Sequence, residues 1–225
     1  ILGEDGQKMS KSRGNVVNPD DIVAEYGADS MRLYEMFMGP LVDTKPWSTR
    51  GVEGVHRFLN RAWRMLAGPD GRLHPSVREA ECTPEQDRVL HSTIRKVTED
   101  LGALAFNTAI SQLMISVNEF LNAPTRPRHA MEAFVLLLSP FAPHLAEEFW
   151  EMLGHDTGLS TATWPQLSAE VARAEEIVIA IQVNGKVRGR VTVPVDIADD
   201  ELQRVALAEP GVLATGTGKT GAKVE

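Results

Sequence analysis

Residues 52–66 read Val-Glu-Gly-Val-His-Arg-Phe-Leu-Asn-Arg-Ala-Trp-Arg-Met-Leu, and this stretch decides the fold class. Its apolar residues recur at intervals of three and four, which is the spacing of one face of an α-helix. They are Val55, Phe58, Leu59, Ala62, Met65 and Leu66. The pattern predicts an amphipathic helix that ends at Gly68-Pro69 and needs other helices to cover its apolar face.

Helix signals continue downstream of this stretch. Thr83-Pro84 is a typical helix start, with Thr83 as the cap and Pro84 at the first helical position. Apolar spacing then predicts helices at residues 105–121, 128–138 and 143–153. Because short loops favour antiparallel neighbours, the sequence predicts a bundle of four or five helices.

The flanking regions differ from the bundle. Upstream, Asn18-Pro19-Asp20-Asp21 predicts a helix start, and short helices are expected at residues 22–26 and 30–38. Downstream, Asn184-Gly185 lies between two β-branched runs, at residues 175–183 and 186–193, which is typical of a type I′ hairpin. With a short helix expected at 199–208, these residues predict a small α+β module that is incomplete or altered at its end.

We therefore expect a mainly α protein in three parts. Residues 1–47 form a loop and short helices, residues 48–167 form the antiparallel bundle, and residues 168–225 form the α+β module. The chain starts at Ile1 without a signal segment, so we expect it to be the carboxyl-terminal piece of a longer protein.

Composition narrows the functional classes. The 225 residues carry 23 Lys and Arg against 31 Asp and Glu, a formal charge of −8, which argues against nucleic-acid binding by bulk charge but leaves room for local basic patches. Its one cysteine, Cys82, excludes an internal disulfide framework and fits a reducing cytosol. No apolar run is long enough to span a bilayer, so no membrane partner is expected. We also expect the protein to be cytoplasmic and monomeric.

The first candidate site is the loop Lys8-Met9-Ser10-Lys11-Ser12-Arg13-Gly14-Asn15. Three cations and two hydroxyls lie within six residues, next to glycines that let the backbone approach a ligand. Such a loop suits a polyphosphate, because ammonium groups neutralise charge that grows on a leaving pyrophosphate. The alternative is an ordinary solvated basic loop.

Two further sets of cations occur at regular spacing. Arg57, Arg61 and Arg64 share one helical face, which suits either RNA phosphates or a solvated face whose arginines pair with acids such as Glu53. Lys186, Arg188 and Arg190 are expected on one face of a strand, with Val187, Gly189 and Val191 on the other. That strand face suits either phosphate binding or protection of a sheet edge by charge.

Several other residues are expected to have structural roles. His144 with Glu147 and Glu148 lacks the second histidine of a metal motif, so no metal site is expected in the chain. Cys82 is expected to be a spectator, and the four tryptophans are expected to pack rather than stack on bases. Residues 216–220 (Gly-Thr-Gly-Lys-Thr) lack the first glycine and the preceding strand of a phosphate loop.

The string Lys-Met-Ser-Lys-Ser at residues 8–12 is similar to the signature loop of class I aminoacyl-tRNA synthetases. The resemblance covers roughly residues 1–210 and is strongest to the bacterial-type leucyl-tRNA synthetase family. The strings that carry it include Gly14-Asn15-Val16-Val17-Asn18-Pro19, Tyr26-Gly27-Ala28-Asp29, Arg57-Phe58-Leu59-Asn60-Arg61-Ala62-Trp63, Leu138-Ser139-Pro140-Phe141-Ala142-Pro143-His144 and Gln182-Val183-Asn184-Gly185-Lys186-Val187-Arg188-Gly189.

This resemblance implies an activity and roles for several residues. It implies ATP-dependent activation of leucine to leucyl-adenylate and transfer of leucine to the 3′ end of leucine tRNA, with Mg²⁺ accompanying ATP. Lys8 and Lys11 would stabilise the pyrophosphate, Ser10 would assist as a hydroxyl partner, and Ser12 would also contact ATP; Arg13 ranks below them. The bundle, of the anticodon-binding type, and the carboxyl-terminal module would contact tRNA through the two cation sets.

The resemblance also implies that the nucleotide-binding fold and the leucine pocket lie upstream of Ile1, so the chain alone should not activate leucine. Three alternatives stay open: a stand-alone tRNA-binding protein without catalysis, a piece of a valine or isoleucine enzyme, and a helical interaction module with no RNA role.

Overall fold

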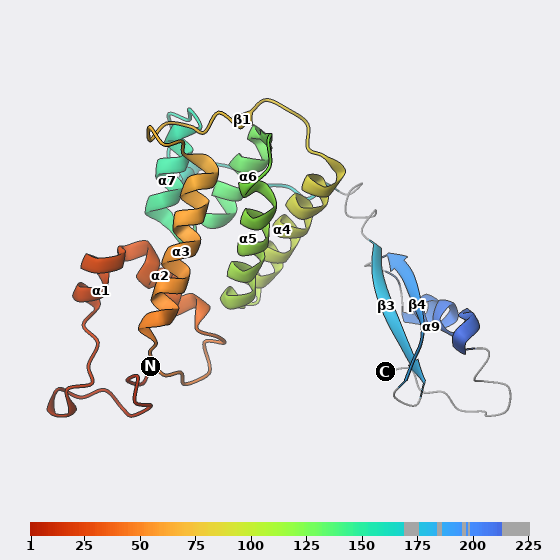
Figure 1. Ribbon diagram of the computed structural model, residues 1–225, viewed down its shortest axis with the longest axis horizontal. Coiled ribbons are helices and arrows are strands. Elements are labelled where there is room, and N and C mark those ends of the chain that lie inside the picture. The colour runs from red at the N-terminus through yellow and green to blue at the C-terminus, as the bar shows by residue number, and fades with distance from the viewer. Residues whose placement is uncertain (169–175, 184–185, 195–196, 198, 213–225) are drawn as a thin grey trace. The chain divides into compact units, whose positions relative to one another are not determined.

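The computed structural model describes residues 1–168, 176–183, 186–194, 197 and 199–212. The chain falls into two compact units, Ile1–Leu167 and Ser168–Glu225 (Figure 1). Helices dominate the described residues, which confirms the predicted fold class. Across those residues, no helix is both long enough and apolar enough to cross a membrane.

The first unit opens with a polar loop and two short helices. The loop contains the short helix η1 (Lys11–Arg13), and it leads into α1 (Pro19–Tyr26) and α2 (Ala28–Phe37). The Asn18 side chain accepts a hydrogen bond of 3.2 Å from the Asp20 amide, so α1 begins at Pro19, at the helix start that Asn18-Pro19 predicts. Gly27, with φ of +87°, separates the two helices as predicted.

Five further helices form the bundle. They are α3 (Thr49–Leu66), α4 (Pro84–Gly102), α5 (Phe106–Leu121), α6 (Arg128–Leu138) and α7 (Pro143–Met152). In Figure 1, α3, α5 and α4 lie side by side, and α6 and α7 cover the far side of the layer. The capping box between Thr83 and Gln86 fixes the start of α4 where Thr83-Pro84 predicts it.

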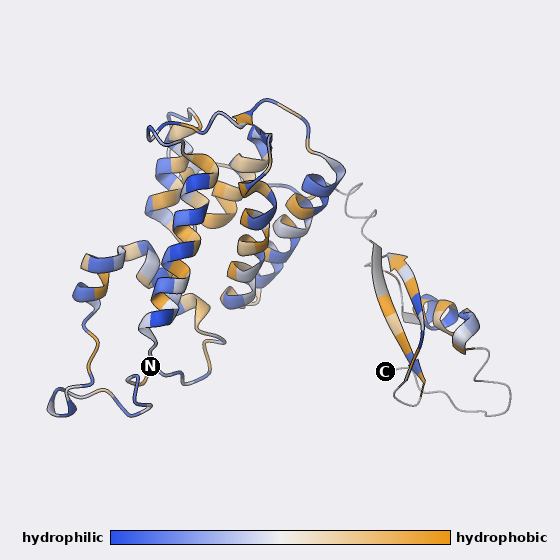
Figure 2. Cartoon of the chain, viewed as in Figure 1, coloured by the Kyte–Doolittle hydropathy of each residue, from blue (hydrophilic) through white to orange (hydrophobic). Residues whose placement is uncertain are grey.

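One continuous apolar core holds the first unit together. Figure 2 shows hydrophobic and hydrophilic residues alternating along α3, as its spacing predicts. Phe120, Phe134, Phe141 and Phe149 come from three helices and one connection, and all four are buried. Burial of one such side chain contributes about 2–3 kcal/mol to folding, so the core outweighs any single surface interaction.

A buried arginine ties two helix ends together, and the sequence gives no sign of it. The connections at β1 (Val77–Arg78) and β2 (Arg126–Pro127) pair as a short parallel ladder, which places Arg126 inside the bundle with 5% of its surface exposed. Its guanidinium donates to the Phe120 carbonyl at 2.9 Å and to the carbonyls of Leu121, Arg64 and Met65. These carbonyls lie at the carboxyl ends of α5 and α3, where a cation is favourable.

The described residues of the second unit form a hairpin and one helix. β3 (Glu176–Val183) and β4 (Lys186–Pro194) are antiparallel, and α9 (Asp199–Ala208) packs against β4. Val183 pairs with Lys186, which confirms the predicted hairpin register at its closed end. The Asn184-Gly185 turn itself and residues 213–225, including the Gly-Thr-Gly-Lys-Thr string, lie outside the described residues.

Candidate functional site

The signature loop, residues 8–15, rises from a tight turn at the start of the chain. The Gly3 amide donates to the Gln7 carbonyl at 2.8 Å, and the Gly6 amide donates to the Gly3 carbonyl at 2.9 Å. At the other end, Gly14 has φ of +67°, a backbone conformation that glycine adopts without strain, and its amide donates to the Lys11 carbonyl. The glycines therefore shape both ends of the loop.

Asn15 closes this loop with its side chain. Its carbonyl oxygen accepts a hydrogen bond of 2.9 Å from the Ser10 amide, and its amide nitrogen donates to the Lys8 carbonyl and to both carboxylate oxygens of Asp5. The Gln7 amide also donates to Asp5, at 3.0 Å. These bonds, from Gln7 first and then from Asn15, hold the pKa of Asp5 below its ordinary value.

The cations of the signature loop face solvent. Lys8, Lys11 and Arg13 are exposed, and no carboxylate in the described ranges lies within ion-pair distance of either lysine. The hydroxyls of Ser10 and Ser12 lie 3.2 Å apart. The structure thus brings the predicted cations and hydroxyls together on one exposed loop, where their charge is available to an anionic ligand. Asn15, to which sequence reasoning gave no role, organises them.

The base of the loop is joined to the start of α3. The Glu4 carboxylate accepts hydrogen bonds of 2.9 Å from both the amide and the hydroxyl of Thr49, while the Ser48 hydroxyl accepts from the Gly51 amide. The bonds from Thr49 lower the pKa of Glu4. Through this junction, the bundle supports the loop that carries the lysines.

The predicted arginine face lies on α3, where helical spacing places it. Arg57 and Arg64 are exposed, and Arg61 is partly exposed with its guanidinium donating to the Asn118 side chain of α5. Arg57 also forms an exposed ion pair of 3.8 Å with Glu53, the alternative that the sequence left open for it. A pair so exposed contributes little to stability and leaves Arg57 able to bind another anion.

The cationic strand differs from its prediction. In β4, Gly189 pairs with Ile181 and Val187 pairs with the next residue, Gln182, so Arg188 is the extra residue of a β-bulge. Val191 is buried, but Val187 is 54% exposed and therefore not on the apolar face. The predicted alternation is wrong across the bulge, because one inserted residue reverses which face its neighbours occupy.

At this bulge, the strand lies against the residue that follows α9. Gly189 lies against the side chain of Glu209, so closely that a β-carbon at residue 189 would overlap it. A glycine is the residue that allows such an approach and such a bulge. Arg188 and Arg190 remain exposed, while the Lys186 side chain lies outside what the structure describes.

His144 lies near a helix start, where the sequence predicts it. His144 is the second residue of α7, and its Nδ1 lies 2.8 Å from the Asp29 carboxylate. Burial, with a smaller contribution from Asp87 and Glu81, raises the pKa of Cys82 to about 11, so this thiol stays protonated and inert at neutral pH. In the described part of the chain, no group of His, Cys, Asp or Glu side chains is arranged to hold a metal ion.

Two parts of the chain match known protein families. Residues 1–46, which include the signature loop, match the family described as tRNA synthetases class I (I, L, M and V). Residues 87–203, which are 117 of the 225 residues, match the family described as the anticodon-binding domain of tRNA ligase.

The chain belongs to the anticodon-binding domain family of tRNA ligases.

Three curated relatives of the chain are leucine–tRNA ligases. The chain is 52% identical over 208 residues to a leucine–tRNA ligase from Rhodopirellula baltica, and 50% identical over 194 and 206 residues to those of Chlorobium phaeobacteroides and Leptospira biflexa. These matches cover 86–92% of the chain but only 22–24% of each relative. The chain is thus similar to the C-terminal portion of leucine–tRNA ligases, which confirms the predicted resemblance.

A solved structure shows the same fold. It is the ternary complex of a LeuRS from Agrobacterium radiobacter with tRNA and LeuAMS, matched at a TM-score of 0.72 and 29% identity. The match covers 99% of this chain and 31% of that one.

Proposed function

We propose that this chain serves a leucine–tRNA ligase, which activates leucine with ATP and transfers it to the 3′ end of leucine tRNA. The chain would supply the pyrophosphate-binding loop and surfaces that hold tRNA. The observation that carries the proposal is the signature loop, in which Lys8 and Lys11 are exposed without a carboxylate partner in the described residues. The comparisons support leucine over valine or isoleucine, because the relatives above are leucine–tRNA ligases.

The chemistry follows from charge. When the leucine carboxylate attacks the α-phosphorus of ATP, the bond to the bridging oxygen breaks and negative charge grows on pyrophosphate. Lys8 and Lys11 would neutralise that charge, and the hydroxyls of Ser10 and Ser12 would donate to the phosphate oxygens. These donors fit an anionic polyphosphate, which would bring its own Mg²⁺. Leucine and adenosine would be bound by parts of the ligase outside this chain.

Two cationic surfaces, one on α3 and one on β4, would bind tRNA. Arg57, Arg61 and Arg64 on α3 suit contacts with RNA phosphates, and Arg188 and Arg190 with Lys186 would form a second contact. We further propose the division into a catalytic-domain tail at 1–47, an anticodon-binding-type bundle at 48–167 and a tRNA-binding module at 168–225. Since charged tRNA feeds protein synthesis, we place the protein in the cytoplasm, where it would act as a monomer.

Pyrophosphate exchange in a chimeric ligase tests the loop. The chain would replace the matching portion of the Rhodopirellula baltica relative, which is 52% identical over 208 residues. We expect Lys11→Ala to lower the exchange rate by about 10²–10³-fold, the usual cost of removing one donor to a developing charge. Ser12→Ala should cost much less, and Arg13→Ala is the matched control because it removes a neighbouring exposed cation. Equal losses for Lys11→Ala and Arg13→Ala would contradict the proposal.

A further inference from the structure

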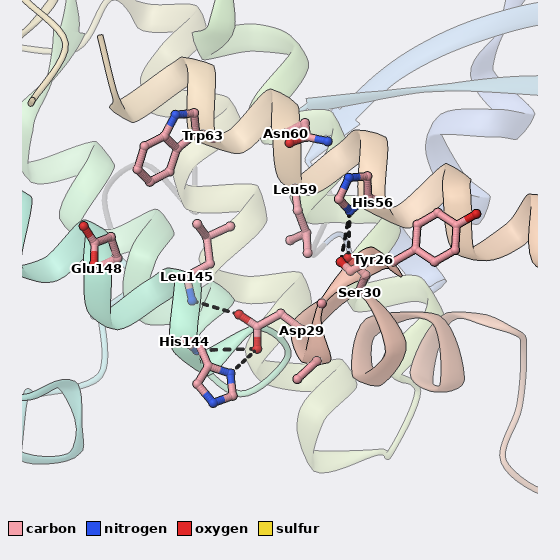
Figure 3. Close-up of a pocket in the computed structure, with 12 residues that line it drawn as sticks. Tyr26, Asp29, Ser30, His56, Leu59, Asn60, Trp63, His144, Leu145 and Glu148 are labelled. Atoms are coloured by element: carbon pink, nitrogen blue, oxygen red, sulfur yellow. Dashed lines mark hydrogen bonds and ion pairs between the residues drawn. The ribbon is translucent and has the colours of Figure 1, made fainter. Parts of the chain in front are cut away.

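A pocket of about 460 Å³ lies between the junction of α1 and α2, the middle of α3 and the start of α7 (Figure 3). Its apolar wall includes Leu59, Trp63 and Leu145, and its polar groups include His56, Asn60 and Glu148. It lies apart from the signature loop, and none of the proposed roles above uses it. Apolar walls with a few fixed polar groups are typical of small-ligand sites.

His56 presents a hydrogen-bond acceptor to this pocket. Its Nδ1 lies 3.2 Å from the Tyr26 carbonyl and 3.0 Å from the Ser30 hydroxyl. Since a carbonyl only accepts, we assign the proton to Nδ1, which makes Nε2 of the neutral ring an acceptor. Figure 3 shows this second nitrogen on the opposite side of the ring, toward Asn60. It has no hydrogen-bond partner among the residues that the structure describes.

The pocket disfavours an anion. Asp29 belongs to α2, and its side chain reaches the start of α7. There its carboxylate accepts hydrogen bonds from the Leu145 amide at 2.8 Å and from the His144 amide and ring (Figure 3). The carboxylate already satisfies the amino end of α7, so that end offers no free site for a phosphate. Glu148 adds a second carboxylate. A suitable ligand group is therefore uncharged or cationic, donates hydrogen bonds and carries an apolar face.

The cationic face of α3 borders the pocket. His56, Asn60 and Trp63 line the pocket, and the next residue in each case is one of the three arginines, Arg57, Arg61 and Arg64. Successive residues of a helix differ by about 100° around its axis, so the two faces are adjacent. A polynucleotide that crosses α3 can thus place its phosphates on the arginines and a neutral nucleoside in the pocket.

We propose that this pocket binds the ribose and base of one unpaired tRNA nucleotide, with His56 Nε2 accepting from a ribose hydroxyl. Glu148 and Asn60 would bind amino and carbonyl groups of the base, and the apolar wall would contact its flat face. Unpaired bases and the 2′-hydroxyl are the features by which proteins recognise RNA. This inference rests on the proposed function, since it assumes that the chain binds tRNA.

Two substitutions of His56 separate ligand binding from a structural role. His56→Asn keeps a donor near the position of Nδ1 for the Tyr26 carbonyl but removes the acceptor at Nε2. His56→Gln reaches the position of Nε2 with an acceptor but loses the bond to Tyr26. If His56 only supports the fold, His56→Gln should weaken tRNA binding more than His56→Asn does. If His56 binds a nucleotide, His56→Asn should weaken tRNA binding more.

We would measure binding of a leucine tRNA transcript to the whole chain across a salt series. We expect His56→Asn and the surface change Asn60→Ala each to weaken binding by roughly 3–10-fold, the usual effect of one hydrogen bond. The salt slope should not change, because no phosphate contact is lost. The 2′-hydroxyls of the unpaired tRNA positions would then be removed one at a time. At one position, removal should weaken binding to the wild type but have no further effect on binding to His56→Asn.

Three results would overturn the inference. His56→Asn and Asn60→Ala could both bind the leucine tRNA as tightly as the wild type at every salt concentration, which leaves the pocket to a protein or peptide partner. The order of the two His56 variants could follow their thermal stability instead of ligand binding. Absence of tRNA binding by the wild type would overturn the proposed tRNA surface and this inference together, whereas the first two results overturn this inference alone.

Discussion

The signature loop and the helical bundle are held by different interactions. Residues 8–15 owe their shape to side-chain and backbone hydrogen bonds centred on Asn15, and their cations face solvent. The bundle owes its shape to a continuous apolar core and to the buried Arg126, which binds the carboxyl ends of α3 and α5. The difference teaches that the groups proposed for chemistry lie on the part with least burial, where small rearrangements around a ligand cost little.

The largest effect should come from Arg126 inside the bundle. Arg126→Ala leaves helix-end carbonyls of α3 and α5 without a donor, so we expect a loss of about 3 kcal/mol in the free energy of unfolding. Arg78→Ala is the matched control: Arg78 is the exposed residue of the other strand in the same ladder and donates to the Thr125 hydroxyl. Urea unfolding measures both. Similar losses for the two variants would show that Arg126 does not hold the helix ends.

A smaller effect is expected where the loop joins the bundle. Gly51, in the first turn of α3, lies against the ring of Tyr34, so that a β-carbon there would overlap the ring. Gly51→Ala should therefore destabilise the protein by about 1–2 kcal/mol, although alanine favours helices. Gly54, one turn along, has open space around it apart from Arg57, and Gly54→Ala should stabilise by about 0.5–1 kcal/mol. Changes of the same sign would contradict this packing.

The smallest effect concerns pH and belongs to the loop alone. Hydrogen bonds from Gln7 and Asn15 lower the pKa of Asp5 in the folded loop. The stabilisation is therefore present above the ordinary pKa of an aspartate and is lost as pH falls through the lowered value. In an NMR titration, the Ser10 amide and the Asn15 side chain should shift together with Asp5, at a pH below 3.8. In Asn15→Ala the Asp5 midpoint should move toward 3.8 while the bundle signals stay unchanged.

Sequence patterns predict the bundle better than the details of the sites. Helix positions follow from apolar spacing and local caps such as Asn18 and Thr83, which a few neighbouring residues determine. Arg126 could not be predicted in this way, because its partners are backbone carbonyls from two distant helices. The bulge at Arg188 could not be predicted either, because the contact that accompanies it joins Gly189 to the side chain of Glu209, which is distant in the sequence. Non-local contacts leave no period in the sequence.

The signature loop falls between these cases. Its cations and hydroxyls stand out in the sequence, and the structure places them together. The role of Asn15 had one available signal, because asparagine after glycine in a polar loop often bonds to nearby backbone. The pairing with Asp5, ten residues away, required the folded turn.

One binding measurement tests most directly whether the bundle holds tRNA. The wild-type chain and the triple variant Arg57→Ala, Arg61→Ala, Arg64→Ala would be compared on a leucine tRNA and a valine tRNA across a salt series. We predict tighter binding of the leucine tRNA by the wild type. In the triple variant, the slope of log K against log salt should fall by up to about three, one unit for each lost phosphate contact. An unchanged slope, or no binding to either tRNA, would contradict a role for the α3 arginines in holding tRNA.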